Sequence, residues 1–226
     1  MSEDLSPFLQ AGPTVESDHP EVAAFARAAA GAAASDKEKS IRLYYAVRDG
    51  IRYDPYTSSL EVAGLRASRT LREKRGYCVS KAILLAAACR AVGMPARLGY
   101  ADVRNHLSTA KMRERMQTDV FYWHGYTAHY LDGRWVKSTP AFNIELCEKF
   151  GLKPLEFDGE TDSIFHPLDK AGHRHMEYLH DRGEFAEPPL DRMLATFVRE
   201  YPHWRDRDVA PTGDFEAEVD AETGHG

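Results

Sequence analysis

The sequence predicts an α+β fold in which a central helix carries a cysteine and packs on an antiparallel β-sheet, behind a helical N-terminal part. Residues 78–92 are rich in Ala and Leu and are apolar nearly all the way round, which indicates one buried helix. Residues 120–131 and 134–139 are rich in aromatic side chains and flank Asp132-Gly133. This pattern predicts a β-hairpin with a two-residue type I′ turn.

Helices are also predicted for the first third of the chain. Residues 18–34 form an Ala-rich helix with Asp18 as its N-cap, and residues 35–38 are a capping box that starts a second helix. That second helix ends at Gly50, and residues 68–74 form a third, short one. Residues 1–17 are predicted to be either poorly ordered or bound to the surface.

The rest of the chain divides less sharply. We predict one domain over residues 1–204, with a C-terminal wrapping segment at 144–204, and an acidic flexible tail at 205–226. Within this plan the expected elements are a strand at 96–103, a polar loop or short helix at 104–118, a short helix at 141–152, a loop at 153–185 and a last helix at 190–201.

Composition excludes several classes of partner and fixes an expected compartment. The 226-residue chain carries a net charge of −6, so no nucleic-acid or acidic-membrane partner is expected. Its start lacks the basic and apolar regions of a signal peptide, and its longest apolar run is too short and too polar to span a bilayer. Three cysteines without metal-ligand spacing suit a reducing compartment, so we expect a cytoplasmic protein.

Cys78 is the candidate nucleophile. It stands at the start of the central helix behind Gly76, where the helix dipole and free backbone N–H groups favour a thiolate. Lys74, Arg75 and Lys81 are expected to act in the same direction. The alternative is that Cys78 is only a small core residue, as free cysteines commonly are.

The hairpin supplies a candidate base. If Leu131 and Arg134 flank the turn, Tyr126 faces Thr139, and His124 becomes a diagonal neighbour of Thr139 on one face of the sheet. A histidine there can act as a base if that face turns toward Cys78. The alternative is a strand histidine satisfied by the core or by solvent.

Over residues 38–143 the chain resembles the transglutaminase-like superfamily, which has a papain-like fold. The resemblance is carried by Gly76-Tyr77-Cys78, by the helix and exit at residues 81–97, and by His124 with the Leu131-Asp132-Gly133-Arg134-Trp135-Val136 segment. It implies a cysteine-bearing helix on an antiparallel sheet, with Cys78 as nucleophile and His124 as base.

The third position of that family's site differs here. Where the family has Asp before a proline, this sequence has Thr139 before Pro140. A hydroxyl can orient an imidazole but supplies no charge. Thr139 is therefore the first candidate for the orienting residue, and Asn143 and Asp162 are the alternatives.

Four residues are candidates for substrate binding: Tyr77, Arg104, Asn143 and His166. Tyr77 adjoins the nucleophile, and Arg104 follows a strand where it could meet an anionic group. His166, His173, His175 and His180 could alternatively be metal ligands, but their spacing fits no familiar motif, so neither a metal nor a cofactor is expected.

Together these residues predict a cysteine-dependent enzyme that transfers an acyl group through a thioester. The substrate is a small-molecule or peptide acyl compound, and hydrolysis of an amide or peptide-type bond is the favoured reaction. The alternatives are a transglutaminase or other acyltransferase with an amine acceptor, and a non-catalytic binding protein on the same fold. No oligomeric state is predicted.

Overall fold

The central helix, α5 (Cys78–Ala91), is buried on every side. Each of its residues from Cys78 to Arg90 is buried, as their nearly uniform apolar character predicts. One side of α5 packs on helices, and the other packs on two strands. These neighbours are α1 (Pro20–Ala30), α2 (Asp36–Gly50), α4 (Ala67–Glu73), β3 (Ala96–Asn105) and β4 (Val120–Leu131).

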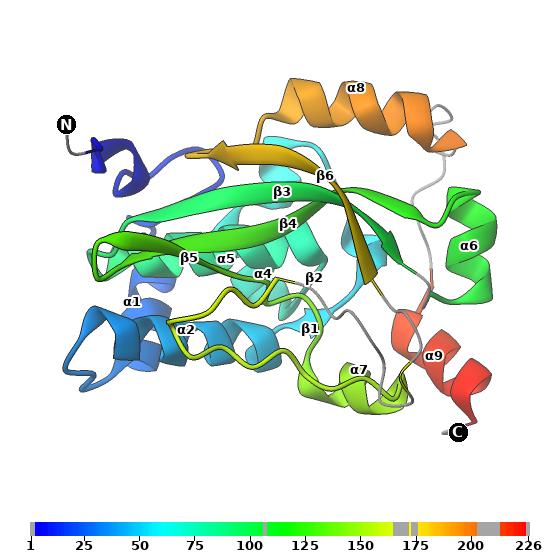
Figure 1. Cartoon of the computed structure of the whole chain (residues 1–226), viewed down its shortest axis with the longest axis horizontal. Helices are drawn as coiled ribbons and strands as arrows, with labels where there is room; N and C mark the ends of the chain where they lie inside the picture. Colours follow the sequence, from blue (N-terminus) through cyan, green and yellow to red (C-terminus); the bar gives the residue numbers. More distant parts are fainter. Residues whose placement is uncertain (1–2, 106–107, 165–171, 173–175, 203–212, 225–226) are drawn as a thin grey trace.

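A four-stranded sheet covers α5. The computed structural model describes residues 3–105, 108–164, 172, 176–202 and 213–224. In it the strand order is β5-β4-β3-β6, and every neighbouring pair is antiparallel, with β5 at Arg134–Ser138 and β6 at Met176–Phe185. Figure 1 shows the sheet and α5 at the centre, α1 and α2 below them and α8 (Leu190–Glu200) above. The predicted α+β architecture, in which a central helix that bears Cys78 packs on an antiparallel sheet, is therefore confirmed.

Shorter elements complete the chain. A two-stranded parallel sheet, β1 with β2, brings the chain to the start of α5. The remaining elements are η1 (Ser6–Phe8), β1 (Arg52–Tyr53), η2 (Pro55–Thr57), α3 (Val62–Leu65), β2 (Arg75–Gly76), α6 (Ala110–Met116), α7 (Ile144–Lys149) and α9 (Phe215–Thr223).

The hairpin has the predicted register. Leu131 pairs with Arg134, and the ladder continues regularly to Thr127 and Ser138. Asp132 and Gly133 both have positive φ, at 50° and 81°, as a type I′ turn requires. β5 then ends one residue earlier than predicted. The next residue, Thr139, donates its backbone N–H to Ser163 (2.9 Å), so the expected pair with Tyr126 does not form.

The N-terminal lead lies on the surface, which is one of the two predicted alternatives. The Trp135 indole donates to Glu3, and Phe8 packs edge-on against Trp135 at 5.5 Å between ring centroids. The buried Arg90 guanidinium also donates to the carbonyl of Gln10 (2.9 Å). The lead is thus tied both to the hairpin and to the end of α5.

The first helix differs slightly from its prediction. α1 begins at Pro20 behind His19, whose ring accepts from the backbone of Glu21 (3.3 Å), so Asp18 is not the N-cap. It ends at Ala30 rather than near residue 34. The second helix starts as predicted, since the Ser35 hydroxyl accepts from the backbone of Glu38 (3.1 Å).

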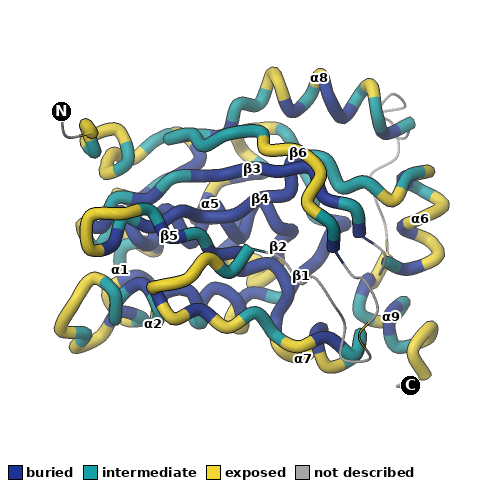
Figure 2. The backbone as a smooth tube through the Cα atoms, in the orientation of Figure 1, coloured by how far each residue is buried: buried dark blue, intermediate teal, exposed yellow. Residues whose placement is uncertain are grey.

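Two predictions for the C-terminal third were wrong. The predicted loop at 153–185 contains β6, which pairs with β3 along its length. The predicted flexible tail at 205–226 contains α9, whose Phe215 and Val219 belong to the same buried cluster as the rest of the chain. The predicted boundary near residue 204 falls outside the described residues. Figure 2 shows the contrast between the buried centre and the more exposed β6, α8 and α9.

No helix in the described part of the chain combines the length and the apolar character that crossing a membrane requires.

A buried lysine joins α5 to α2. The Lys81 ammonium, one turn into α5, donates to the carbonyl oxygens of Arg48 (2.9 Å) and Ile51 at the end of α2. Burial lowers the pKa of this ammonium to about 7. Unpaired carbonyls at a helix end need such donors, so Lys81 acts as a cap supplied by another helix.

This environment predicts a pH-dependent contribution to stability. Because the folded pKa of Lys81 is about 7 and an unfolded lysine titrates near 10.4, the unfolded chain binds more protons between these pH values. The free energy of unfolding of the wild type, relative to Lys81→Met, should therefore rise from pH 7 to 10 by about 1 kcal/mol per pH unit. Urea unfolding of both proteins across this range measures it. A difference that stays constant with pH would contradict the assignment.

Candidate active site

Cys78 reaches the start of α5 through a tightly packed approach. A Cβ on Gly76 would lie 2.5 Å from the Ser80 hydroxyl and 3.1 Å from a methyl group of Thr70, so only glycine fits there. Tyr53 pairs with Gly76 in the small parallel sheet. This packing fixes the first turn of α5 and leaves Cys78 at its N-terminus.

The strand β4 crosses this helix start at very short range. A Cβ on Gly125 would lie 2.9 Å from the Cα of Val79 and 3.2 Å from the carbonyl oxygen of Cys78. Thr127 is the last residue of β4 that pairs with β5, and Gly125 lies two residues before it in the chain. The backbone of Gly125 is thus in direct contact with the backbone of α5.

The electrostatics of Cys78 differ from the prediction. Burial raises the pKa of its thiol to about 11, while the backbone N–H groups of Gly125, Val79 and Cys78 itself act in the opposite direction. Desolvation opposes the charged form more strongly than these N–H groups favour it. At neutral pH the Cys78 side chain is therefore a thiol, and the expected preformed thiolate is corrected.

The three nearby cations do not supply the expected help. Lys81 points toward the end of α2, and Arg75 lies 3.4 Å from the carboxylate of Asp54. Lys74 is an exposed, left-handed residue at the end of α4. The three cations are close to Cys78 in the sequence, but none of these contacts brings its charge to the thiol, so this expectation was wrong.

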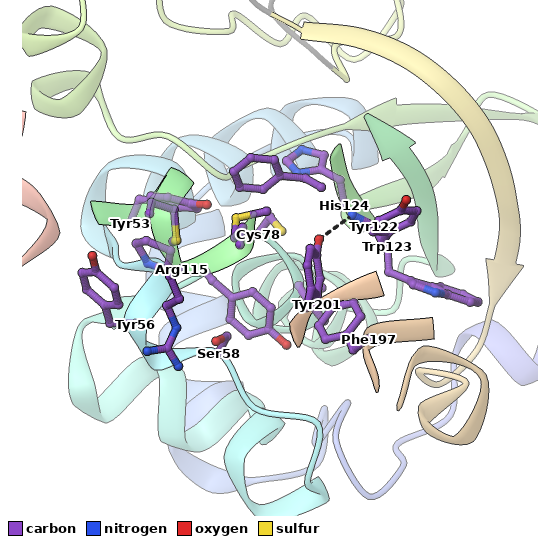
Figure 3. Close-up of a pocket in the computed structure, with 16 residues that line it drawn as sticks. Tyr53, Tyr56, Ser58, Cys78, Arg115, Tyr122, Trp123, His124, Phe197 and Tyr201 are labelled. Atoms are coloured by element: carbon purple, nitrogen blue, oxygen red, sulfur yellow. Dashed lines mark hydrogen bonds between the residues drawn. The ribbon is translucent and has the colours of Figure 1, made fainter. Parts of the chain in front are cut away.

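His124 is the residue before Gly125 and is buried. It lines the same cavity as Cys78, whose empty space, including its open mouth, is about 610 Å³. Figure 3 shows Tyr56 and Arg115 on one side of Cys78 and Tyr201 and Phe197 on the other. The full lining is Tyr53, Pro55, Tyr56, Ser58, Tyr77, Cys78, Val79, Met112, Arg115, Met116, Phe121, Tyr122, Trp123, His124, Phe197 and Tyr201.

Thr139 lies near His124 but has another partner. Both residues line a second, shallow pocket whose empty space, including open solvent, is about 190 Å³. The Thr139 hydroxyl donates to the carbonyl of Ile164 (2.9 Å), which leaves its oxygen lone pairs as acceptors. The structure thus brings Thr139 and His124 together on one cavity wall.

The two alternatives to Thr139 are engaged elsewhere. The Asn143 side chain accepts from the backbone of Tyr53 (3.1 Å) and donates to Glu145 (2.9 Å), so it serves the start of α7. Asp162 accepts from the backbone of Lys137 (2.9 Å) at the edge of β5. Neither contact concerns His124.

The other candidate substrate-binding residues have different positions. Tyr77 lines the cavity, and its hydroxyl donates to the carbonyl of Ser59 (2.7 Å). Arg104 is not among the lining residues and pairs with Asp119 (3.1 Å) and Glu177 (3.3 Å). Asn143 does not line this cavity either, and His166 lies outside the described residues.

Sequence reasoning missed most of the cavity wall. Met112 and Met116 come from α6, and Tyr53 and Tyr56 come from the approach to Cys78. Phe197 and Tyr201 come from α8 and its C-cap. The sequence shows an apolar stripe that contains Phe197 on the last predicted helix, but it does not show which surface this stripe packs against.

Among the residues that the structure describes, no group of three or more His, Cys, Asp or Glu side chains could hold a metal ion. Of the four histidines considered as ligands, His166, His173 and His175 lie outside the described residues.

Comparison with known proteins identifies the class. A model of the transglutaminase-like superfamily matches residues 23–140, just over half of the chain. The protein therefore belongs to the transglutaminase-like superfamily, and the resemblance found in the sequence is confirmed. The match includes Cys78, His124 and Thr139.

Two solved structures are similar at low identity. One, named "a Putative Cysteine Protease from Cytophaga hutchinsonii", is 18% identical, with a TM-score of 0.47, over 82% of this chain and 55% of that chain. The other, named "a Putative Protease from Parabacteroides distasonis", is 18% identical, with a TM-score of 0.39, over 59% and 24%. This chain thus spans about half and a quarter of their lengths. No curated protein matches.

The buried thiol predicts an unusual pH profile for alkylation. With a Cys78 pKa of about 11, the rate of reaction with iodoacetamide should rise about tenfold per pH unit from pH 7 to 10. Mass spectrometry of the peptide that contains Cys78 measures this rate separately from Cys89 and Cys147. A plateau at or below pH 8 would indicate a preformed thiolate and contradict the structure.

Proposed function

We propose that this protein is a cysteine-dependent acyl-transfer enzyme that hydrolyses an amide or peptide-type bond through a thioester on Cys78. The observation that carries the proposal is one cavity that contains Cys78 at a helix start and His124 beside it. Membership of the transglutaminase-like superfamily supports the same assignment.

His124 acts as the general base in the proposed first step. It takes the proton of the Cys78 thiol as the sulfur attacks the carbonyl carbon of the substrate. Since the pKa of the free thiol is about 11, this transfer accompanies the attack and does not precede it. The Cys78 backbone N–H stabilises the oxyanion.

The tetrahedral intermediate then collapses. The C–N bond breaks, the amine leaves with the proton that His124 returns, and the acyl group stays on Cys78 as a thioester. A water molecule gives a proton to His124 and attacks the thioester carbon, which releases the acid and restores the thiol. Water is the proposed acceptor because the cavity that contains Cys78 is partly open to solvent.

The cavity wall suggests an apolar acyl group. Most of its lining side chains are aromatic or aliphatic, including Phe121, Phe197 and Met112, whereas Arg115 is the lining residue with a permanent charge. Burial of a phenyl group against such a wall favours binding by about 2 kcal/mol. An aromatic acyl donor is therefore the first choice of substrate for a test.

The proposal predicts a covalent intermediate on one cysteine. Wild-type protein mixed with p-nitrophenyl hydrocinnamate should release a burst of p-nitrophenolate and carry the acyl group on Cys78, as seen by mass spectrometry. Cys78→Ser should abolish the burst, and His124→Ala should slow it about 100-fold, a typical contribution of a general base. Cys147→Ser, which removes another buried cysteine, should leave it unchanged.

The fate of the acyl group separates the alternatives. If the acyl group leaves Cys78 as the free acid, the reaction is hydrolysis. If added methylamine speeds the loss of the acyl group and the product is the methylamide, the reaction is transfer to an amine. If no acyl group forms on Cys78, the enzyme proposal fails and the non-catalytic binding protein takes its place.

A second prediction concerns the orienting residue. We propose that Thr139 orients His124, so Thr139→Val, which keeps the shape and removes the hydroxyl, should slow acylation about tenfold. Asp162→Ala is the matched control and should stay within twofold of wild type, because that carboxylate bonds the Lys137 backbone. A loss in Asp162→Ala without a loss in Thr139→Val would reverse the assignment.

A further inference from the structure

β-Bulges lie on both sides of β3, the strand between β4 and β6. On one side of β3, Ala101 pairs with His124 and Val103 with Phe121, so Asp102 stands opposite two residues of β4. On the other side, Tyr100 pairs with Gly183 and Ala101 with Asp181, which leaves Arg182 as an extra residue of β6. A second shift of β6, between Asp102 and Val103, leaves Leu179 as another. Bulges often re-aim a side chain beside an active site. The extra residues of β4 directly precede His124.

Asp102 connects the bulge of β4 to the Arg182 bulge of β6. This buried carboxylate accepts the backbone N–H of Trp123 (3.1 Å) and, with both oxygens, the Nε–H of Arg182 (2.9 Å). A further bond joins the Arg182 Nη2 group to the same carboxylate. A two-point guanidinium–carboxylate pair has a fixed geometry, so Asp102 is held rigidly where it meets the backbone of β4.

Trp123 needs such support because its backbone is left-handed. Its φ is 59°, a conformation that costs a bulky residue about 1–2 kcal/mol. The indole points away from Cys78 (Figure 3), and two guanidinium groups lie over its ring, Arg182 at 5.2 Å and Arg192 at 5.6 Å. The backbone N–H of Trp123 is therefore held by β3, and its ring packs against side chains of β6 and α8.

The other extra residue of the bulge is also anchored. The backbone N–H of Tyr122 donates to the hydroxyl of Tyr201 (2.8 Å), drawn as the dashed line in Figure 3. That hydroxyl donates in turn to the carbonyl of Val120 (3.2 Å). Side chains thus satisfy both N–H groups that the bulge removes from the ladder.

His124 directly follows the bulge. From His124 to His129 the ladder with β3 is regular, so the bulge does not change the face on which His124 lies relative to Thr127 and His129. Tyr122, Trp123 and His124 all line the cavity of Cys78. The backbone at Trp123 therefore fixes the peptide from which the His124 side chain enters this cavity.

We propose that Asp102, held by Arg182, is a positioning residue that locks the left-handed turn at Trp123 and so aims His124 at Cys78. This inference rests on the proposed function, in which His124 is the base. Asp102 reaches the reaction only through the backbone of β4.

Another ion pair between the same strands provides a matched control. Arg104 of β3 pairs with Glu177 of β6 at 3.3 Å. The ion pairs described for Arg104 and Glu177 do not involve the backbone of Trp123. Glu177→Gln therefore removes a link between β3 and β6 without touching the bulge.

The experiment measures acylation of Cys78 by p-nitrophenyl acetate in Asp102→Asn, Arg182→Met, Arg182→Lys and Glu177→Gln. Each variant is made in the wild-type background and again with His124→Ala. Asp102→Asn and Arg182→Met should slow acylation at least tenfold, because a misplaced base loses much of its effect. Arg182→Lys should recover part of the rate, and Glu177→Gln should stay within twofold.

The double variants distinguish positioning from general loosening of the fold. If Asp102 acts through His124, Asp102→Asn should change the rate less than twofold once His124 is alanine. An equal loss in both backgrounds, or no loss in either, would overturn the inference. If His124→Ala alone leaves the rate unchanged, the proposed base itself is wrong, so the two failures have different signatures. Thermal unfolding of each variant verifies that it is folded at the assay temperature.

Discussion

The contact between two backbones, Gly125 on β4 and the Cys78–Val79 peptide on α5, determines the geometry of the site. A side chain at Gly125 would overlap the Cα of Val79, so strand and helix approach as closely as chains can. This approach brings the Gly125 N–H to the Cys78 sulfur and places His124 in the same cavity. At Gly76 the chain is packed just as tightly, against Ser80 and Thr70, directly before this helix start.

Much of the fold was predictable, because its central elements carry strong local signals. The helix from Cys78 was predicted to within a residue at its C-terminal end, since Ala and Leu fill it and Gly93 follows. Asp132-Gly133 specified its turn and hence the register. The elements that were not predicted are those stabilised by contacts with distant parts of the chain. β6 is an edge strand with charged residues, and α9 depends on Phe215 packing at 5.8 Å from Tyr53 and on its acids pairing with Lys149.

The sequence predicted which residues lie at the site better than it predicted their backbone conformation and protonation state. Cys78 and His124 share a cavity. The bulge directly before His124 was not predicted, because the side chains that hold it lie on β3, β6 and α8 and leave no local signal in the sequence. Likewise, local charge favoured a thiolate, whereas burial, a property of the whole fold, decides the protonation state.

The high pKa of Cys78 also has a consequence for chemical damage. Peroxides attack thiolates, and a group with a pKa of about 11 is ionised in only about one molecule in 10,000 at pH 7. The cysteine that carries the proposed chemistry is thus shielded from conversion to sulfenic acid while no substrate is bound. A nucleophile that becomes reactive only as its base removes the proton needs no resolving cysteine beside it, and Cys89 and Cys147 are both buried, free thiols.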